Sequence, residues 1–213
     1  MRTQEKKNDL LNREASFFKI LSSPHRLQLL NFISFAPRTV EDCSQRIGQS
    51  IQNTSLHLKV LAKAGIVSAD KVKNFNFYSI QKGSASTHLF SHLDSPHFSL
   101  FPSELICSQG LESLVSAVKK GEIRLVDLRG SEERLFINIP HAIVFDQKVE
   151  RLPSFLQSHF SKKESLVFFC RGRICTRLLE STEISIKEGY NVKALPLSAI
   201  GLSSLSLELQ SRF

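Results

Sequence analysis

The sequence predicts two domains of different class, a mainly α-helical domain followed by an α/β domain with a parallel central sheet. The length of 213 residues suits two small domains better than one. Helical periodicity dominates the chain up to Gly65, whereas after residue 103 short apolar runs alternate with helical patterns. We therefore expect domains at residues 1–94 and 104–213, joined at residues 95–103 by a linker that mixes Pro and Ser.

The net charge of +8 is concentrated in the first domain. Residues 1–80 hold 12 Lys and Arg against 6 Asp and Glu, whereas residues 103–213 hold 15 against 13. Such an excess suits contact with a polyanion, although a charged face that only keeps a domain soluble has the same composition.

The composition also indicates a cytoplasmic protein. No apolar stretch approaches the ~20 residues that a membrane span needs, and the polar start MRTQEKKNDL is unlike a signal peptide. The four cysteines (43, 107, 170 and 175) are therefore expected to meet a reducing compartment. There, catalytic, metal-binding or packed thiols are more common than disulfides.

Helices and one hairpin account for the first domain. Residues 15–33 predict two amphipathic helices, and residues 50–63 predict a further helix that ends at Gly65. Between them, Thr39 with Asp42 indicates a capping box, and Gly48 ends a short helix. Residues 66–80 alternate in parts around a polar centre, as a β-hairpin does. The expected core side chains are Phe18, Leu21, Leu27, Leu30, Ile33, Ile51, Leu58 and Leu61.

This order of elements is the layout of a winged helix-turn-helix domain. Residues 14–80 resemble the ArsR family of bacterial repressors, most specifically in the pattern SxHLxxLxxAGxV at Ser55 to Val67. The resemblance implies a double-stranded DNA operator as partner and a homodimer formed through helices at 5–20 and 83–94. A polar helix face that merely solvates, or a domain used for protein contacts, is the alternative.

The helix at 50–63 is expected to enter the major groove, and the hairpin to reach the phosphates. His57 is open to two readings, contact with DNA or packing beside Leu58. The candidate DNA-binding residues are Ser50, Gln52, Asn53, Ser55, His57, Lys59, Lys71 and Lys73.

Metal binding in this half has weaker support. The Cys-Val-Cys site of the family is absent, because Thr39-Val40-Glu41 stands there, and we expect Cys43 to be a core thiol. His88 and His92, with Asp94 and His97 nearby, have the spacing of a zinc half-site, or they form a polar helix end. We assign no metal site and no cofactor, and keep a metal-responsive repressor as an alternative.

Strands alternating with helices account for the second domain. Strand-like runs lie at residues 123–129, 142–145, 165–170 and 192–195, and helical patterns lie at 103–122 and 177–190. This alternation predicts a parallel sheet flanked by helices.

Three segments of this half resemble a rhodanese, a sulfurtransferase domain. They are LVDLRGSEER at 125–134, NIPHAI at 138–143 and the loop FFCRGRICTR at 168–177. The resemblance implies a rhodanese-like fold and a persulfide on Cys170. The chain departs from the family in having Ile137-Asn138 in place of Gly-His, His141 in place of a later Gly, and no Trp. These departures leave open a weak enzyme or a sensor.

The loop chemistry fits a reactive thiol. Cys170 follows an apolar strand, and Gly172 permits a tight loop whose N–H groups point at the sulfur. With the start of a helix at Thr176, these donors favour a Cys170 thiolate of lowered pKa. Arg171 and Arg173 are expected to bind an anionic donor such as thiosulfate or polysulfide. The candidate catalytic residues are Cys170, Arg171, Gly172, Arg173, Cys175 and Thr176.

Other features of this half limit the alternatives. Phosphatase and arsenate-reductase chemistry needs Cys-x5-Arg, but Thr176 stands where the arginine is required. Cys175 has two open roles, resolving a Cys170 persulfide or packing at the helix start. Asp127 and Arg129 are expected to form a structural ion pair at a strand end.

The function predicted is a DNA-binding transcriptional regulator whose rhodanese domain handles or senses reactive sulfur at Cys170. The alternative is an enzyme instead of a regulator, namely a sulfurtransferase with an accessory winged-helix domain.

Overall fold

The computed structural model describes residues 2–81 and 100–210 of the chain. They belong to two compact units, Met1–Ser86 and Thr87–Phe213. The expected interface helix at 83–94, and with it His88, His92, Asp94 and His97, lies outside the described residues. Among the helices that are described, none has the length and hydropathy needed to cross a membrane.

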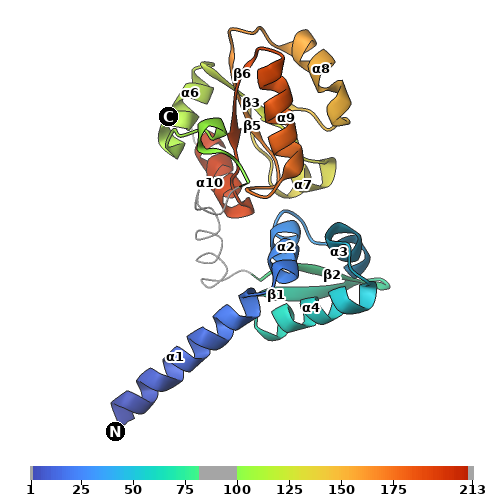
Figure 1. Ribbon diagram of the computed structural model, residues 1–213, viewed down its shortest axis with the longest axis vertical. Coiled ribbons are helices and arrows are strands. Elements are labelled where there is room, and N and C mark those ends of the chain that lie inside the picture. The colour runs from blue at the N-terminus through green and yellow to red at the C-terminus, as the bar shows by residue number, and fades with distance from the viewer. Residues whose placement is uncertain (1, 82–99, 211–213) are drawn as a thin grey trace. The chain divides into compact units, whose positions relative to one another are not determined.

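Within residues 2–81, four helices and an antiparallel hairpin form the described part of the first unit (Figure 1). This order confirms the expected winged helix-turn-helix layout. Helix α1 is long and projects from the rest of its unit (Figure 1). The elements are α1 (Arg2–Leu21), α2 (Pro24–Ile33), α3 (Val40–Ile47), α4 (Ile51–Lys63), β1 (Val67–Val72) and β2 (Phe75–Ile80).

Hydrogen bonds and backbone conformation at the helix ends determine where α3 begins and ends and where α4 begins. Thr39 and Asp42 form the expected capping box, with the Asp42 N–H donating to Thr39 Oγ1 at 3.2 Å and the Thr39 N–H donating to Asp42 Oδ2 at 3.1 Å. Gly48 ends α3 with a φ of 65°, a left-handed conformation that favours glycine. Ser50 then caps α4 by accepting from the Asn53 N–H at 3.2 Å.

The core of this unit contains Leu30, Leu58 and Leu61, which are all fully buried. Two expected core residues are exposed instead. Phe18 is 68% exposed because it lies on the projecting helix α1, and Ile51 is 53% exposed because it lies in the first turn of α4, at the edge of the core.

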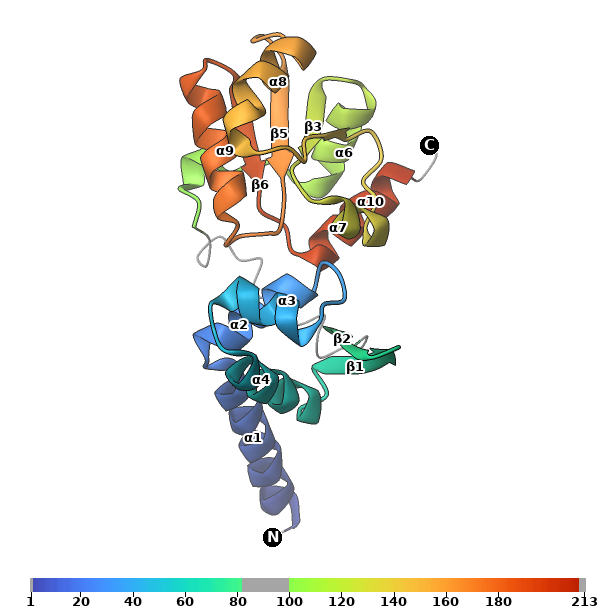
Figure 2. The same cartoon turned by 90° about the vertical axis from the view of Figure 1, so that its right-hand side faces the viewer.

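A parallel four-stranded sheet of order β4-β3-β5-β6 forms the second unit, as the alternation of patterns predicted. Helices α8 and α9 cover one face of the sheet, and α6 and α10 cover the other (Figures 1 and 2). The strands are β3 (Ile123–Asp127), β4 (Ile143–Val144), β5 (Ser165–Phe169) and β6 (Asn191–Leu195). The helices are α6 (Leu111–Lys119), α7 (Ser131–Phe136), α8 (Leu152–His159), α9 (Thr176–Lys187) and α10 (Ala199–Gln210), with short 3-10 turns at Ser103–Leu105 and Val149–Arg151.

The prediction of a single helix at residues 103–122 is wrong. Gly110 is the N-cap of α6, so the α-helix covers only Leu111–Lys119. Ahead of it, Ile106 bridges to Ala194, and the Cys107 N–H donates to the Ala194 carbonyl at 2.8 Å. Pairing with the edge of the sheet therefore replaces helical hydrogen bonds in this segment.

Candidate DNA-binding surface and cysteine site

The solvent-exposed side of helix α4 mixes polar side chains with the apolar Leu56 and Val60. Gln52, Asn53 and Lys59 are exposed on it, whereas Thr54 and Leu58 on the opposite face are fully buried. The exposed face therefore carries donors and acceptors of the kind that read base edges. Ser55 is half-buried, which makes it a less accessible candidate.

His57 packs against a neighbouring helix. Its ring lies 5.5 Å, centroid to centroid, from the ring of His25 on α2. The pKa of His57 is lowered because burial disfavours the charged ring, and the positive charge of Arg26 and the nearby His25 act in the same direction. This contact is with α2, and contact of the half-buried His57 with DNA stays a prediction. His25, whose Nε2 lies 3.2 Å from Gln49 Nε2, carried no signal in the sequence.

The hairpin carries the two remaining candidate lysines. Lys71 is the last but one residue of β1, and Lys73 lies in the turn with a φ of 54°. Both side chains are exposed, as are the neighbouring Val72 and Phe75. The two ammonium groups are thus accessible to a phosphate backbone.

The second candidate site is the loop between β5 and α9. Cys170 follows β5, and Cys175 is the N-cap residue of α9. The loop closes through a hydrogen bond from the Cys175 N–H to the Gly172 carbonyl at 3.2 Å, and Gly172 has a φ of 80° that favours glycine. Cys170 is only 1% exposed and Cys175 only 2%, and both belong to one apolar cluster with Leu178.

The pKa values of the two thiols are shifted in opposite directions. The pKa of Cys175 falls to about 6, because its thiolate accepts the S–H of Cys170 and the backbone N–H groups of Arg171 and Leu178. The pKa of Cys170 is raised by its donation to Cys175 and by burial. The Cys170 thiol also faces the Leu128 carbonyl at 3.6 Å. The loop therefore favours one thiolate within the coupled Cys170–Cys175 pair, and a Cys170 thiolate stays a prediction.

The arginines near the loop already hold partners of their own. Arg171 Nε donates to Glu133 Oε1 at 2.9 Å, and the Glu133 side chain is only 3% exposed. Arg177 donates to three backbone carbonyls, including that of Leu128 at 3.0 Å. Arg173 is half-buried, and its carbonyl accepts from the N–H of Leu100 at 3.0 Å. Thr176 is exposed at the start of α9.

Glu133 has a partial signal in the sequence, because an acid three residues after Gly130 is typical of a helix start. Glu133 accepts from the Gly130 N–H at 2.8 Å in that way. Its second role, as the partner of Arg171, depends on a contact across the fold and was missed.

Two expectations about buried polar groups are confirmed. Asp127 and Arg129 form an ion pair at the end of β3, with Arg129 Nη2 2.7 Å from Asp127 Oδ2. Cys43 is fully buried, and burial raises the pKa of its thiol to about 12. Within residues 2–81 and 100–210, no group of three or more His, Cys, Asp or Glu is placed to hold a metal ion.

Comparison with known proteins places the first unit in a family. Residues 23–69 match the family model described as bacterial regulatory protein, arsR family. The HTH-type transcriptional regulator Rv0324 of Mycobacterium tuberculosis is 26% identical over 210 residues, which cover 90% of this chain and 87% of that protein. A probable mercury resistance operon repressor of Streptomyces lividans is 44% identical over 55 residues, 26% of this chain and 44% of that protein.

One solved structure with a similar first unit is the solution NMR structure of the homodimeric winged helix-turn-helix DNA-binding domain Mb0332, fragment 1–100, from Mycobacterium bovis. It is 29% identical and covers 41% of this chain and 80% of its own, with a TM-score of 0.38. The family match coincides with the segment in which α2, α3, α4 and the first hairpin strand have the expected order. The N-terminal unit of this chain is therefore an ArsR-family winged helix-turn-helix domain, and the chain is a DNA-binding transcriptional regulator.

Proposed function

We propose that this regulator binds a double-stranded operator as a cytoplasmic homodimer. Helix α4 would read bases with Gln52, Asn53 and Lys59, and the hairpin would bring Lys71 and Lys73 to the phosphates. The exposed side chains of Leu10, Leu11 and Phe18 on α1 support a dimer, because these apolar groups would be covered by a partner. The M. bovis relative is described as homodimeric, which supports the same assembly.

We propose further that the second unit is rhodanese-like and takes up sulfane sulfur at Cys170. Its position after β5, ahead of the start of α9, supports this reading. The φ of 63° at His141 supports it too, because the rhodanese motif has a glycine at that position and only glycine adopts this conformation freely.

The proton arrangement provides a mechanism for uptake. Cys170 would attack the outer sulfur of a polysulfide or thiosulfate while its S–H proton passes to the Cys175 thiolate. The bond between the two donor sulfurs breaks, and the donor leaves as a shorter polysulfide or as sulfite. In this proposal Cys175 is the proton acceptor that makes Cys170 nucleophilic, which the lowered pKa of Cys175 supports.

The burial of both sulfurs favours a sensor over an enzyme with rapid turnover. Cys170 is 1% exposed and Cys175 is 2% exposed. A donor reaches them only after the loop opens, and Arg171 is already paired with Glu133 instead of facing an anion. Slow, stoichiometric uptake suits a reporter of sulfur status better than multiple turnover. A sulfurtransferase would instead release thiocyanate from cyanide at enzyme-like rates.

The test exposes the full-length protein to polysulfide and measures the loop peptide by mass spectrometry alongside binding to DNA selected by the protein from a random pool. We expect one added sulfur on Cys170 and a changed affinity for the selected DNA. Cys170→Ser should lose both responses, and Cys43→Ser serves as the matched control. A labelled protein with unchanged DNA affinity would contradict the sensing role.

A metal-responsive repressor is a second candidate, favoured by the 44% identity to the mercury resistance operon repressor over 55 residues. It predicts that adding Hg²⁺ or Zn²⁺ releases the selected DNA in wild-type protein and in Cys170→Ser alike. Metal addition without any change in DNA binding would rule this candidate out.

A further inference from the structure

The segment that enters the second unit is bound directly to the loop between the two cysteines. The Leu100 N–H donates to the Arg173 carbonyl at 3.0 Å, and the Phe101 side chain, 5% exposed, lies in the apolar cluster that contains Cys170 and Cys175. The Leu100 side chain is 49% exposed, so Leu100 is held through its backbone. We call this pair of contacts, at Leu100 and Phe101, the loop clamp.

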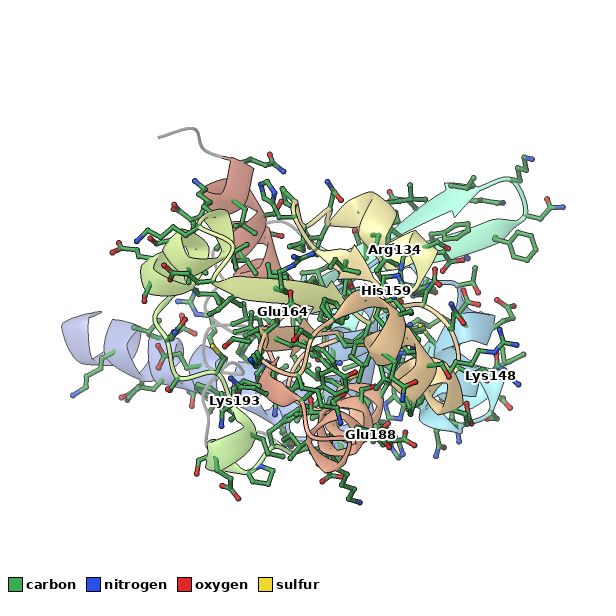
Figure 3. All side chains as sticks on the ribbon, turned by 90° about the horizontal axis from the view of Figure 1, so that it is seen from above. Arg134, Lys148, His159, Glu164, Glu188 and Lys193 are labelled. Carbon is green, nitrogen blue, oxygen red and sulfur yellow. The ribbon has the colours of Figure 1, made fainter. Side chains whose placement is uncertain are left out.

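The clamp is stiffened on its far side. Pro102 follows Phe101 directly and restricts it to extended backbone. Beyond it, Lys193 Nζ, labelled in Figure 3, donates to the Glu104 carbonyl, and the Cys107 N–H donates to the Ala194 carbonyl at 2.8 Å. Residues 104–107 are therefore fixed to β6, and a movement at Arg173 is not absorbed there.

On its N-terminal side the clamp is joined to the DNA-binding unit along the chain. The last strand of that unit, β2, is the second strand of the hairpin that carries Lys71 and Lys73, and the Gln81 N–H donates to the Ile66 carbonyl at 3.0 Å. Along the chain, residues 82–99 join Gln81 to Leu100. Leu100 and Phe101 are therefore the first described residues of the second unit.

Sulfur chemistry at the cysteines must move the loop. Both thiols are buried in an apolar cluster, so we expect an added sulfur atom to displace the side chains packed around it. A disulfide would instead pull the two sulfurs to ~2.05 Å. Because Cys170 is held by β5 and Cys175 by α9, the displacement falls on residues 171–174, including the Arg173 carbonyl.

We propose that the loop clamp transmits the sulfur state of Cys170 and Cys175 to the DNA-binding unit, an inference that rests on the proposed function. Transfer of a sulfane sulfur from R–S–SH to Cys170 breaks the donor S–S bond, releases R–S⁻ and leaves the Cys170 proton on Cys175. Attack of Cys175 on the inner sulfur of the Cys170 persulfide then forms a disulfide and expels sulfide, which takes up that proton. Two thiols are oxidised, and the sulfane sulfur is reduced. Either product displaces Arg173 and releases the Leu100 N–H.

Leu100→Pro tests the clamp in the full-length protein, because proline lacks the N–H that Arg173 accepts. Leu100→Ala keeps that N–H and is the matched control. In the reduced proteins, we expect Leu100→Pro to bind the selected DNA with an affinity at least about fivefold different from Leu100→Ala, in the direction that polysulfide shifts the wild type. Polysulfide should then label Cys170 in Leu100→Pro without a further change in affinity.

The outcomes separate this inference from the proposed function. Labelling of Cys170 with an unaltered DNA response in Leu100→Pro overturns the clamp and leaves the sensor intact. If the wild-type protein takes up no sulfur, the proposed function fails. Independently of that result, equal DNA affinities of reduced Leu100→Pro and reduced Leu100→Ala would overturn the clamp. Phe101→Leu, which keeps an apolar side chain but fills less of the cluster, provides a second variant if Leu100→Pro does not fold. It should shift the affinity in the same direction.

Discussion

The guanidinium of Arg129 and the carboxylate of Asp127 form two hydrogen bonds, Nε to Oδ1 at 2.9 Å and Nη2 to Oδ2 at 2.7 Å, with both side chains buried. The pair holds the turn that leaves β3, and the Leu128 carbonyl in that turn faces the Cys170 thiol. The cysteine site is therefore built on a buried ion pair whose residues lie two positions apart.

Removing one charge of this pair should destabilise the second unit strongly. We expect Asp127→Asn to lower its free energy of unfolding by about 3–5 kcal/mol, because Arg129 would remain buried without its counter-charge. Urea unfolding followed by circular dichroism measures the change. Arg124→Gln, which loosens an exposed contact to Glu164 at 3.7 Å, should change the free energy of unfolding by less than about 1 kcal/mol.

Replacing Cys170 should raise the pKa of Cys175. The largest cause of the lowered value, about 6, is the S–H that Cys170 donates, and Cys170→Ala removes it while burial continues to disfavour the thiolate. Thiolate absorbance against pH should therefore titrate at higher pH in Cys170→Ala than in wild type. Cys43→Ala should leave the low-pH titration in place, since the Cys43 thiol has a pKa of about 12. An unchanged midpoint in Cys170→Ala would count against the shared proton.

Gln52 should contribute base discrimination. Its exposed position on α4 suits paired hydrogen bonds to a base edge. We expect Gln52→Ala to weaken binding to the selected DNA by about 1–3 kcal/mol and to relax the preference at one base pair. Gln28→Ala, an exposed glutamine of α2, is the control and should leave the preference unaltered. Loss of affinity spread evenly over all sequences would contradict base reading by Gln52.

Lys71 should act on phosphates and not on bases. Lys71→Ala is expected to weaken binding to all DNA sequences alike and to reduce the slope of log affinity against log salt by about 1. Fluorescence anisotropy at several salt concentrations measures both. Lys148→Ala removes an exposed charge from the second unit, labelled in Figure 3, and should leave the slope as in wild type. A slope that does not change in Lys71→Ala would place the hairpin away from DNA.

Acidification should destabilise the first unit through His57. Its pKa is lowered in the folded state by burial, Arg26 and His25, so the unfolded chain binds the proton at a higher pH than the folded one. Stability is therefore retained above about pH 6.5 and falls as the pH drops toward the folded pKa. Thermal unfolding at about pH 7.5 and about pH 5.5 should show a smaller pH effect in His57→Gln than in wild type. His159→Gln, an exposed histidine of the second unit, should behave as wild type.

Local patterns in the sequence determined the elements and their order. Apolar spacing predicted α2 and α4, the Thr39–Asp42 pair predicted the start of α3, and short apolar runs predicted the four parallel strands. The ion pair of Asp127 and Arg129 was predictable for the same reason, since its members lie two residues apart. All of these features depend on residues that are only a few positions apart in the sequence, so a local pattern is enough to predict them.

The tertiary structure decided everything that depends on distant partners. Glu133 pairs with Arg171 across 38 positions, His57 packs on His25, and the Leu100 N–H meets the Arg173 carbonyl. The burial of Cys170 and Cys175 follows from the packing of the residues after β5 and at the start of α9 in one apolar cluster. The loop residues alone predicted a reactive thiol, but the surrounding fold decides how far both sulfurs are removed from water, because burial of the loop depends on packing against distant residues.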